Sequence, residues 1–137
     1  MTRVFITGLL LCACLMLTGC ASTVGMSEGF DKSVNAYNRM LRWRELERAG
    51  MTYVAAEQQE PYLIQADVLR KRGLTITDFR LLSSRCLPET GSGEAVAEFD
   101  YYILPSNRIK TISYRQEWLY LEESRGWKLK SGLPLFE

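Results

Sequence analysis

Apolar residues recur at helical spacing in the first third of the chain. Steps of four, three and four residues, which mark one face of an α-helix, separate Phe30, Val34, Tyr37 and Leu41. Ser27 or Asp31 can cap the start of this helix. We expect it to run to about Ala49 and to end at Gly50.

Two shorter helices are expected after it. Residues 52–59 have a helical composition, and Pro61 suits the first turn of a further helix. That helix would turn Leu63, Ala66 and Leu69 inward and end at Gly73.

From residue 74 onward the pattern becomes strand-like. We expect strands over residues 74–86, 95–104, 109–122 and 127–133, joined by short loops that favour an antiparallel meander. One face of the second strand carries Ala95, Ala97, Phe99, Tyr101 and Ile103. One face of the third carries Ile112, Tyr114, Gln116, Trp118 and Tyr120. The sequence therefore predicts an α+β domain, with a long N-terminal helix and short helices packed on a curved antiparallel meander of about four strands.

The first 20 residues have a different character. Arg3 supplies a positive charge, and an apolar stretch of 14 residues runs from Val4 to Leu17. A membrane-spanning helix needs about 20 apolar residues, so this stretch is short for that role. Its length and the small residues after it are typical of a cleaved export signal.

The stretch ends in Leu17-Thr18-Gly19-Cys20, which resembles the lipobox of bacterial prolipoproteins at all four positions. The resemblance implies that the Cys20 thiol receives a diacylglyceryl group and that cleavage falls between Gly19 and Cys20. Further acylation, typically by palmitate, would complete a stable membrane anchor. The alternatives are an ordinary signal peptide or an N-terminal anchor in which the cysteine is coincidental.

The same resemblance implies a division of the chain. Residues 1–19 would be the lipoprotein signal, 20–27 a lipidated tether and 28–137 a single domain. Ala21, rather than an aspartate, follows the cysteine, which in two-membrane bacteria implies an outer-membrane address facing the periplasm.

Cysteine and histidine usage narrows the chemistry. Cys12 and Cys14 would leave with the signal and Cys20 would be lipidated, so Cys86 alone would remain and no intramolecular disulfide is expected. We expect Cys86 to be a small buried residue, although a reactive or intermolecular role stays open. The chain has no histidine, so the side chain best suited to proton transfer near neutral pH is missing.

Charge gives little sign of a nucleic-acid partner. The chain has 17 basic and 16 acidic residues, and loss of Arg3 with the signal would balance them. Of two basic clusters, the first suggests a phosphate or anionic-lipid site, although Glu45 and Glu47 nearby favour a solvated face. The second falls in the last turn of a helix, where cations offset the C-terminal dipole. The two clusters are Arg39, Arg42, Arg44 and Arg48, and Arg70-Lys71-Arg72.

The strand motifs carry a second resemblance. Gln116-x-Trp118-x-Tyr120, Gly126-Trp127-x-Leu129 and Leu133-Pro134 resemble small bacterial members of the nuclear-transport-factor-2-like superfamily, which has a cone-shaped fold of cystatin type. The resemblance implies a pocket between the sheet and the long helix. Its candidate lining is Tyr37, Phe99, Tyr101, Tyr114, Gln116, Trp118 and Tyr120, which can equally fill a core.

Three functions remain in view. We expect a membrane-anchored envelope lipoprotein whose domain is a non-enzymatic binding or interaction module for an envelope protein. The alternative is a small-molecule or lipid-binding cone, and a cone-fold enzyme of the isomerase or cyclase type is the least favoured of the three.

The acidic residues do not favour an enzyme. Asp100 points away from the Phe99–Tyr101 face, and Asp67 and Asp78 lack an acidic partner. No cofactor, metal site or nucleic-acid partner is expected.

Overall fold

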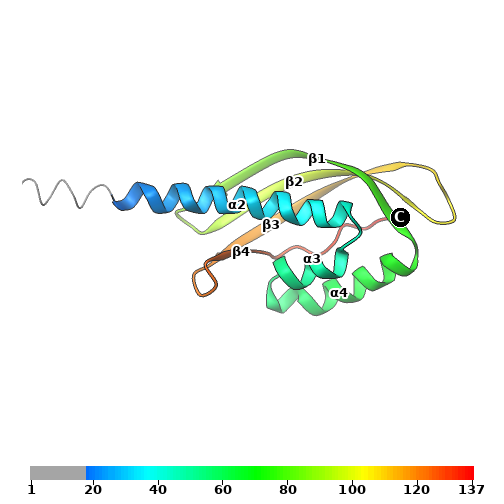
Figure 1. The fold of residues 1–137 in the computed structure, drawn as a ribbon, viewed down its shortest axis with the longest axis horizontal. Coiled ribbons are helices and arrows are strands. Elements are labelled where there is room, and N and C mark those ends of the chain that lie inside the picture. Colours follow the sequence, from blue (N-terminus) through cyan, green and yellow to red (C-terminus); the bar gives the residue numbers. More distant parts are fainter. Residues whose placement is uncertain (1–17) are drawn as a thin grey trace, which may run out of the picture.

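The computed structural model describes residues 18–137, and it has the expected α+β architecture (Figure 1). Its elements are α2 (Thr18–Arg42), α3 (Leu46–Tyr53), α4 (Ala56–Lys71), β1 (Leu74–Leu87), β2 (Ser92–Ile103), β3 (Lys110–Leu121) and β4 (Gly126–Leu129). The strands form one antiparallel sheet in the order β1-β2-β3-β4. The helices lie on one face of this sheet, with α2 running along its length.

The apolar face of α2 forms the centre of the core. Its four predicted members are fully buried: Phe30, Val34, Tyr37 and Leu41. Partners come from the inner face of the sheet, where the side chains of β2 and β3 alternate as predicted. The opposite sheet face is uncovered and carries polar and charged side chains.

The predicted start of this helix is wrong. Ser27 and Asp31 lie inside α2, which begins at Thr18, so residues 20–27, expected to form a tether, are helical. Packing against β4 supports these early turns: the indole nitrogen of Trp127 donates to the Met26 carbonyl (3.0 Å). The Trp127 ring also lies close to Gly29, where an added Cβ would be 3.8 Å from the ring.

The predicted end is also wrong, because a turn separates α2 from α3 where one helix to Ala49 was expected. Arg44 adopts a left-handed conformation (φ 65°). Its N–H bonds to the Leu41 carbonyl, and the Glu45 N–H bonds to the Met40 carbonyl. These two bonds make a Schellman cap, which usually has glycine at the left-handed position. With arginine there, the sequence carries no visible stop signal.

The helix predicted over residues 52–59 does not exist as one unit. The chain is extended at Val54, which pairs with Leu129, and the Ala55 N–H bonds to the Leu129 carbonyl (2.8 Å). This contact with β4 divides the segment between α3 and α4. Pro61 consequently lies inside α4 rather than in its first turn. Gly73 ends that helix as predicted, with φ 76°.

The last strand is shorter than predicted and stops at Leu129. Beyond it, the Glu117 N–H bonds to the Ser131 hydroxyl (2.8 Å), so a side chain replaces a strand carbonyl. The tail then turns under the sheet and buries Leu133 and Phe136 in the core. Phe136 packs edge-on against Tyr101 at 4.8 Å between ring centroids.

Two glycines permit close contacts inside the domain. A Cβ on Gly50 would lie 2.5 Å from the Tyr62 ring, so glycine here lets α3 approach α4. Gly50 therefore serves packing and does not end a helix. A Cβ on Gly93 would lie 2.3 Å from the Phe30 ring, which rests directly on the β2 backbone.

We expect Gly93→Ala to lower the free energy of unfolding by about 1–3 kcal/mol, because the added methyl overlaps a fully buried ring. Gly126→Ala is the matched control, since its Cβ would meet no atom closer than 3.7 Å. Urea titration followed by tryptophan fluorescence measures both variants. Equal stability of the two would contradict the packing of Phe30 on β2.

Candidate functional site

The predicted lipidation site lies at the start of α2. Thr18, Gly19 and Cys20 belong to its first turn, whereas Leu17 and the rest of the predicted export signal lie outside the described residues. The helix continues from Cys20 into the domain without a break. Within residues 18–137, no helix combines the length and the apolar character needed to cross a membrane.

The seven residues predicted to line a pocket come together between α2 and the inner face of the sheet. Six are buried and Tyr120 is half-buried. Their rings pack on one another: Tyr37 meets Trp118 edge-on at 5.7 Å, and Phe99 lies 6.1 Å from Tyr114. Tyr37, Phe99, Tyr101, Tyr114 and Trp118 belong to the hydrophobic core. Trp118 and Tyr120 also border surface hollows.

Three tyrosine hydroxyls meet at the centre of this group. The Tyr37 hydroxyl lies 3.0 Å from those of Tyr62 and Tyr114, which come from α4 and β3. Tyr114 in turn donates to the Gly132 carbonyl in the C-terminal tail (2.8 Å). The hydroxyls thus satisfy one another and join α2, α4, β3 and the tail in one hydrogen-bonded chain.

Burial dominates the protonation of this cluster. Removal from water raises the pKa of the Tyr37 hydroxyl well above its ordinary value, and the neighbouring Tyr114 and Tyr62 raise it further. Burial likewise raises the pKa values of Tyr62 and Tyr114. All three hydroxyls therefore stay neutral at physiological pH. A tyrosine with a raised pKa is a poor general base near neutrality.

A second buried polar pair lies next to the tyrosines. The Gln116 side-chain nitrogen donates to the Asn38 oxygen (2.6 Å), and the Asn38 nitrogen donates to the Val34 carbonyl (2.8 Å) and to the Gln116 oxygen (3.3 Å). The Trp118 indole also donates to the Gln116 oxygen (3.4 Å). Gln116 was expected as a polar group inside a pocket, and its hydrogen bonds go to protein atoms.

The interior is consequently occupied by its own side chains. Across residues 18–137, every described buried side-chain nitrogen or oxygen has a hydrogen-bond partner. The buried polar and charged residues found there are amides, Asn38 and Gln116, with no carboxylate among them. In this part of the chain no cluster of cysteine and acidic side chains can hold a metal ion.

Two hollows lie at the surface near the sheet. One of about 250 Å³ is bordered by Arg85, Leu87, Glu94, Glu117 and Lys130 at the β1–β2 hairpin end of the sheet. Another of about 500 Å³ lies between the early turns of α2 and the β3–β4 turn, beside Gly25 and Arg125. Neither reaches the tyrosine hydroxyls, which are buried.

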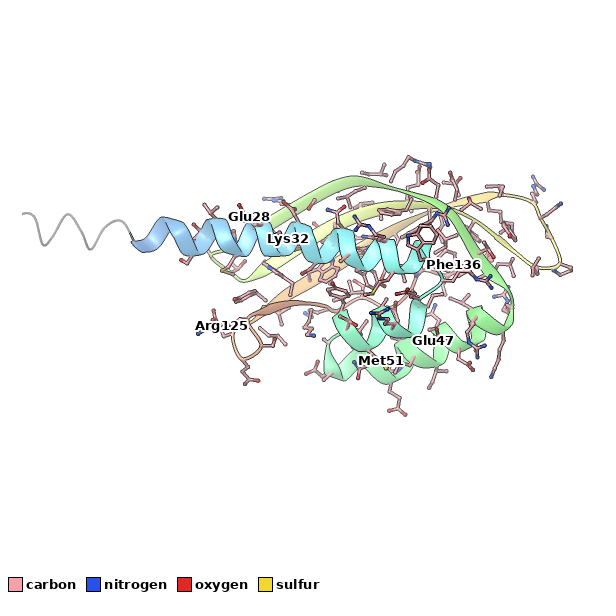
Figure 2. The ribbon with its side chains drawn as sticks, in the orientation of Figure 1. Glu28, Lys32, Glu47, Met51, Arg125 and Phe136 are labelled. Atoms are coloured by element: carbon pink, nitrogen blue, oxygen red, sulfur yellow. The ribbon has the colours of Figure 1, made fainter. Side chains whose placement is uncertain are left out.

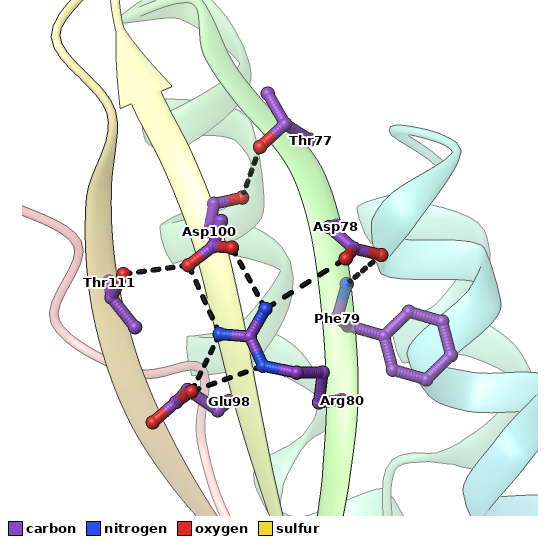
Figure 3. A network of polar contacts seen from close by, with 7 residues as sticks. All are labelled: Thr77, Asp78, Phe79, Arg80, Glu98, Asp100 and Thr111. Atoms are coloured by element: carbon purple, nitrogen blue, oxygen red, sulfur yellow. Dashed lines mark hydrogen bonds and ion pairs between the residues drawn. The ribbon is translucent and has the colours of Figure 1, made fainter.

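Asp100, the acid considered for an enzyme, lies on the uncovered sheet face, as its strand alternation predicts (Figure 3). It accepts hydrogen bonds from Arg80 (2.9 Å) and Thr111 (2.6 Å), and these bonds lower the pKa of its carboxyl. Arg80 also binds Glu98 (2.6 Å). An ionised, paired carboxylate at the surface is unlike the buried, raised-pKa carboxyl that cone-type acid–base chemistry requires.

Cys86 lies on β1 opposite Gly93 and is half-buried. Burial raises the pKa of its thiol, while a hydrogen bond with Ser27 opposes the shift. A raised pKa leaves little thiolate, which is the reactive form.

The two basic clusters are only partly solvated faces. Arg70 and Lys71 pair with Asp67, and Arg70 also reaches Glu47 (2.9 Å). Arg48 pairs with Glu45 (3.4 Å). Arg42 has a structural role that the sequence did not suggest, because it donates to the Ile76 carbonyl at the start of β1 (3.0 Å).

Sequence reasoning missed Asn38 and Tyr62 as the partners of the predicted interior residues. Asn38 follows Tyr37 and Tyr62 precedes Leu63, so each is next to a residue that the apolar spacing marks as inward. That signal gives burial, but not which hydroxyls and amides meet across 25 or 78 positions of chain.

Comparison with known proteins adds no family. No family model matches the chain, and no curated protein matches it. A similar solved structure is the intermembrane space region of chloroplast protein ARC6, with 13% sequence identity, a TM-score of 0.49, and coverage of 72% of this chain and 92% of that chain. At this level of similarity nothing follows about activity.

We expect the three clustered tyrosines to resist ionisation while the chain is folded. Their raised pKa values mean that the stabilising contribution is complete below about pH 10, the ordinary tyrosine value, and is lost as the pH rises above it. At about pH 11, three of the seven tyrosines should ionise only on unfolding in urea, as a step in tyrosinate absorbance. Ionisation of all seven before unfolding would contradict the closed cluster.

We expect Gln116→Leu to lower the free energy of unfolding by about 1–3 kcal/mol, because it leaves the Asn38 amide and the Trp118 indole without their buried partner. Glu117→Leu, one position along on the exposed side of β3, should change stability by less than about 0.5 kcal/mol. Chemical denaturation measures both, and similar losses for the two variants would refute the role of the amide pair.

Proposed function

We propose that the chain is a bacterial cell-envelope lipoprotein, anchored through Cys20, whose α+β domain is a non-enzymatic module that binds another envelope protein. The four-residue lipobox pattern at Leu17 to Cys20 supports the anchor. Ala21 after the cysteine favours the outer membrane, with the domain in the periplasm. The likeness to the nuclear-transport-factor-2-like superfamily remains a prediction from the strand motifs.

One observation carries the choice of a surface-binding module. The hydroxyls of Tyr37, Tyr62 and Tyr114 bond to one another and to the tail, in the region where a ligand-binding cone would keep polar groups facing a cavity. A small molecule would have to displace these bonds and the buried rings around them. Binding through the outside of the domain requires no such rearrangement.

The helical form of residues 20–27 bears on how the domain would be held. A flexible tether would let it tumble beside the membrane. A helix that runs from Cys20 to Arg42 instead fixes one end of the domain near the anchor and turns the other end away. We expect this geometry to present the distal end of the domain to partners.

The anchor is tested by growing bacteria that express the full chain with labelled palmitate. Cys20→Ser should abolish labelling of the chain and leave the longer, uncleaved precursor. Cys86→Ser is the matched control, because it removes a cysteine within the domain and should keep the label. Undiminished labelling of Cys20→Ser would refute lipidation at this residue.

A further inference from the structure

The end of the molecule farthest from the start of α2 has an unusual surface. Figure 1 shows three connecting segments toward this end: the α2–α3 turn, the α4–β1 connection and the β2–β3 hairpin. The basic end, as we name this surface, consists of Trp43, Arg44, Arg72, Leu104, Arg108 and Ile109. Half of these side chains are cationic and half are apolar.

The apolar members are well exposed. Trp43 is 67% exposed, Leu104 57% and Ile109 53%. Leu104 lies against Gly73 at the end of α4, which joins the hairpin to the α4–β1 connection. Exposed apolar side chains gathered at one end of a small domain mark a site of association more often than isolated ones do.

The cationic members lack acidic partners. Arg44 and Arg108 make no ion pair within the described residues, and Arg72 donates only to the Phe136 carbonyl (3.4 Å). Among acidic residues on neighbouring segments, Asp67 binds Arg70 and Lys71, Asp100 binds Arg80, and Glu45 binds Arg48. Glu137 lies beside Lys110, whose amine donates to the Glu137 carbonyl (2.7 Å), so the three arginines and Lys110 face one further acidic side chain. The basic end therefore has a local excess of positive charge, although the chain as a whole is nearly neutral.

Arg44 also occupies a costly position. Its left-handed backbone is the conformation that glycine adopts most easily, and a side chain there costs about 1 kcal/mol. The turn thus holds an unpaired arginine outward, next to Trp43, where glycine would give a more stable cap.

We propose that the basic end docks an acidic segment of a partner protein, one in which carboxylates alternate with apolar side chains. Arginine binds carboxylates through two parallel hydrogen bonds, and the apolar residues need a cover that a free inorganic anion cannot give. This proposal rests on the proposed function, because the anchor at Cys20 is what separates the basic end from the anchoring membrane. Residues 18–42 of α2 span about 37 Å at 1.5 Å per residue, which favours a protein over lipid headgroups.

The test uses the full chain in detergent and three fluorescent peptides. One alternates Glu and Asp with Leu and Phe, the second replaces its acids by lysine, and the third is polyglutamate. Fluorescence anisotropy should show saturable binding that is strongest for the first peptide. Arg44→Glu with Arg108→Glu should weaken it about tenfold or more, because two attractions become repulsions. Trp43→Ser should weaken the first peptide more than polyglutamate.

The matched control is Lys32→Glu with Arg85→Glu, the same change of charge away from the basic end; Figure 2 labels Lys32 on α2. It should stay within about twofold of the unmodified chain. Equal losses in the two double variants, or no saturable binding of the first peptide, would overturn the proposal. Binding to phosphatidylglycerol vesicles that exceeds binding to phosphatidylcholine vesicles, and that Arg44→Glu with Arg108→Glu removes, would also overturn it, in favour of a membrane.

Peptide binding is measured again on Cys20→Ser. Loss of palmitate labelling with binding retained supports both proposals. If Cys20→Ser is still labelled with palmitate, the anchor alone is refuted. If the unmodified chain is lipidated but does not bind the first peptide, the docking surface alone is refuted.

Discussion

The hydroxyl of Tyr37 is the contact on which the rest of the domain depends. It lies on the buried face of the long helix α2 and meets one tyrosine from α4 and one from β3. Tyr114 in turn donates a hydrogen bond to the Gly132 carbonyl in the C-terminal tail. Two helices, the sheet and the tail are therefore joined at one point, and loss of the Tyr37 hydroxyl would remove the hydrogen-bond partner of Tyr62. Buried hydrogen-bonded groups of this kind favour a single packing arrangement, because other arrangements would leave polar atoms buried without a hydrogen-bond partner.

Because the interior is filled by its own side chains, the surfaces are the candidates for binding a partner. The uncovered sheet face is occupied by the Arg80 network, in which paired charges satisfy one another across three strands (Figure 3). The two ends of the domain differ from each other in the side chains that they expose. The end at which α2 begins carries Cys20, and the opposite end carries exposed arginines together with Trp43, Leu104 and Ile109. With the proposed anchor at Cys20, the continuous helix α2 would hold the opposite end away from the membrane, which a flexible tether would not do.

Much of the fold could be predicted because it depends on local periodicity. The inward faces of α2, β2 and β3 follow directly from spacing, and Gly73 ends α4 as a glycine should. The errors arose where distant contacts outweigh local signals. Arg44 ends α2 without the glycine that normally marks such a cap, and Val54 breaks a helical stretch because it pairs with Leu129, 75 positions away. The candidate pocket residues do lie close together in the structure, but their hydrogen-bond partners were not predicted. Composition is the same for a lined pocket and a filled core, so only the positions of atoms such as the Tyr37 hydroxyl distinguish them.

Hydroxyl exchange in the tyrosine cluster tests the central claim most directly. In a mixture of light and heavy water, the ring carbon that bears the hydroxyl gives two NMR signals when exchange is slow and one averaged signal when it is fast. The closed interior predicts two signals for Tyr37, Tyr62 and Tyr114, and one for Tyr102 on the uncovered sheet face. A single averaged signal from all three clustered tyrosines in the folded chain would show that water reaches them, and would contradict a domain that binds through its surface alone.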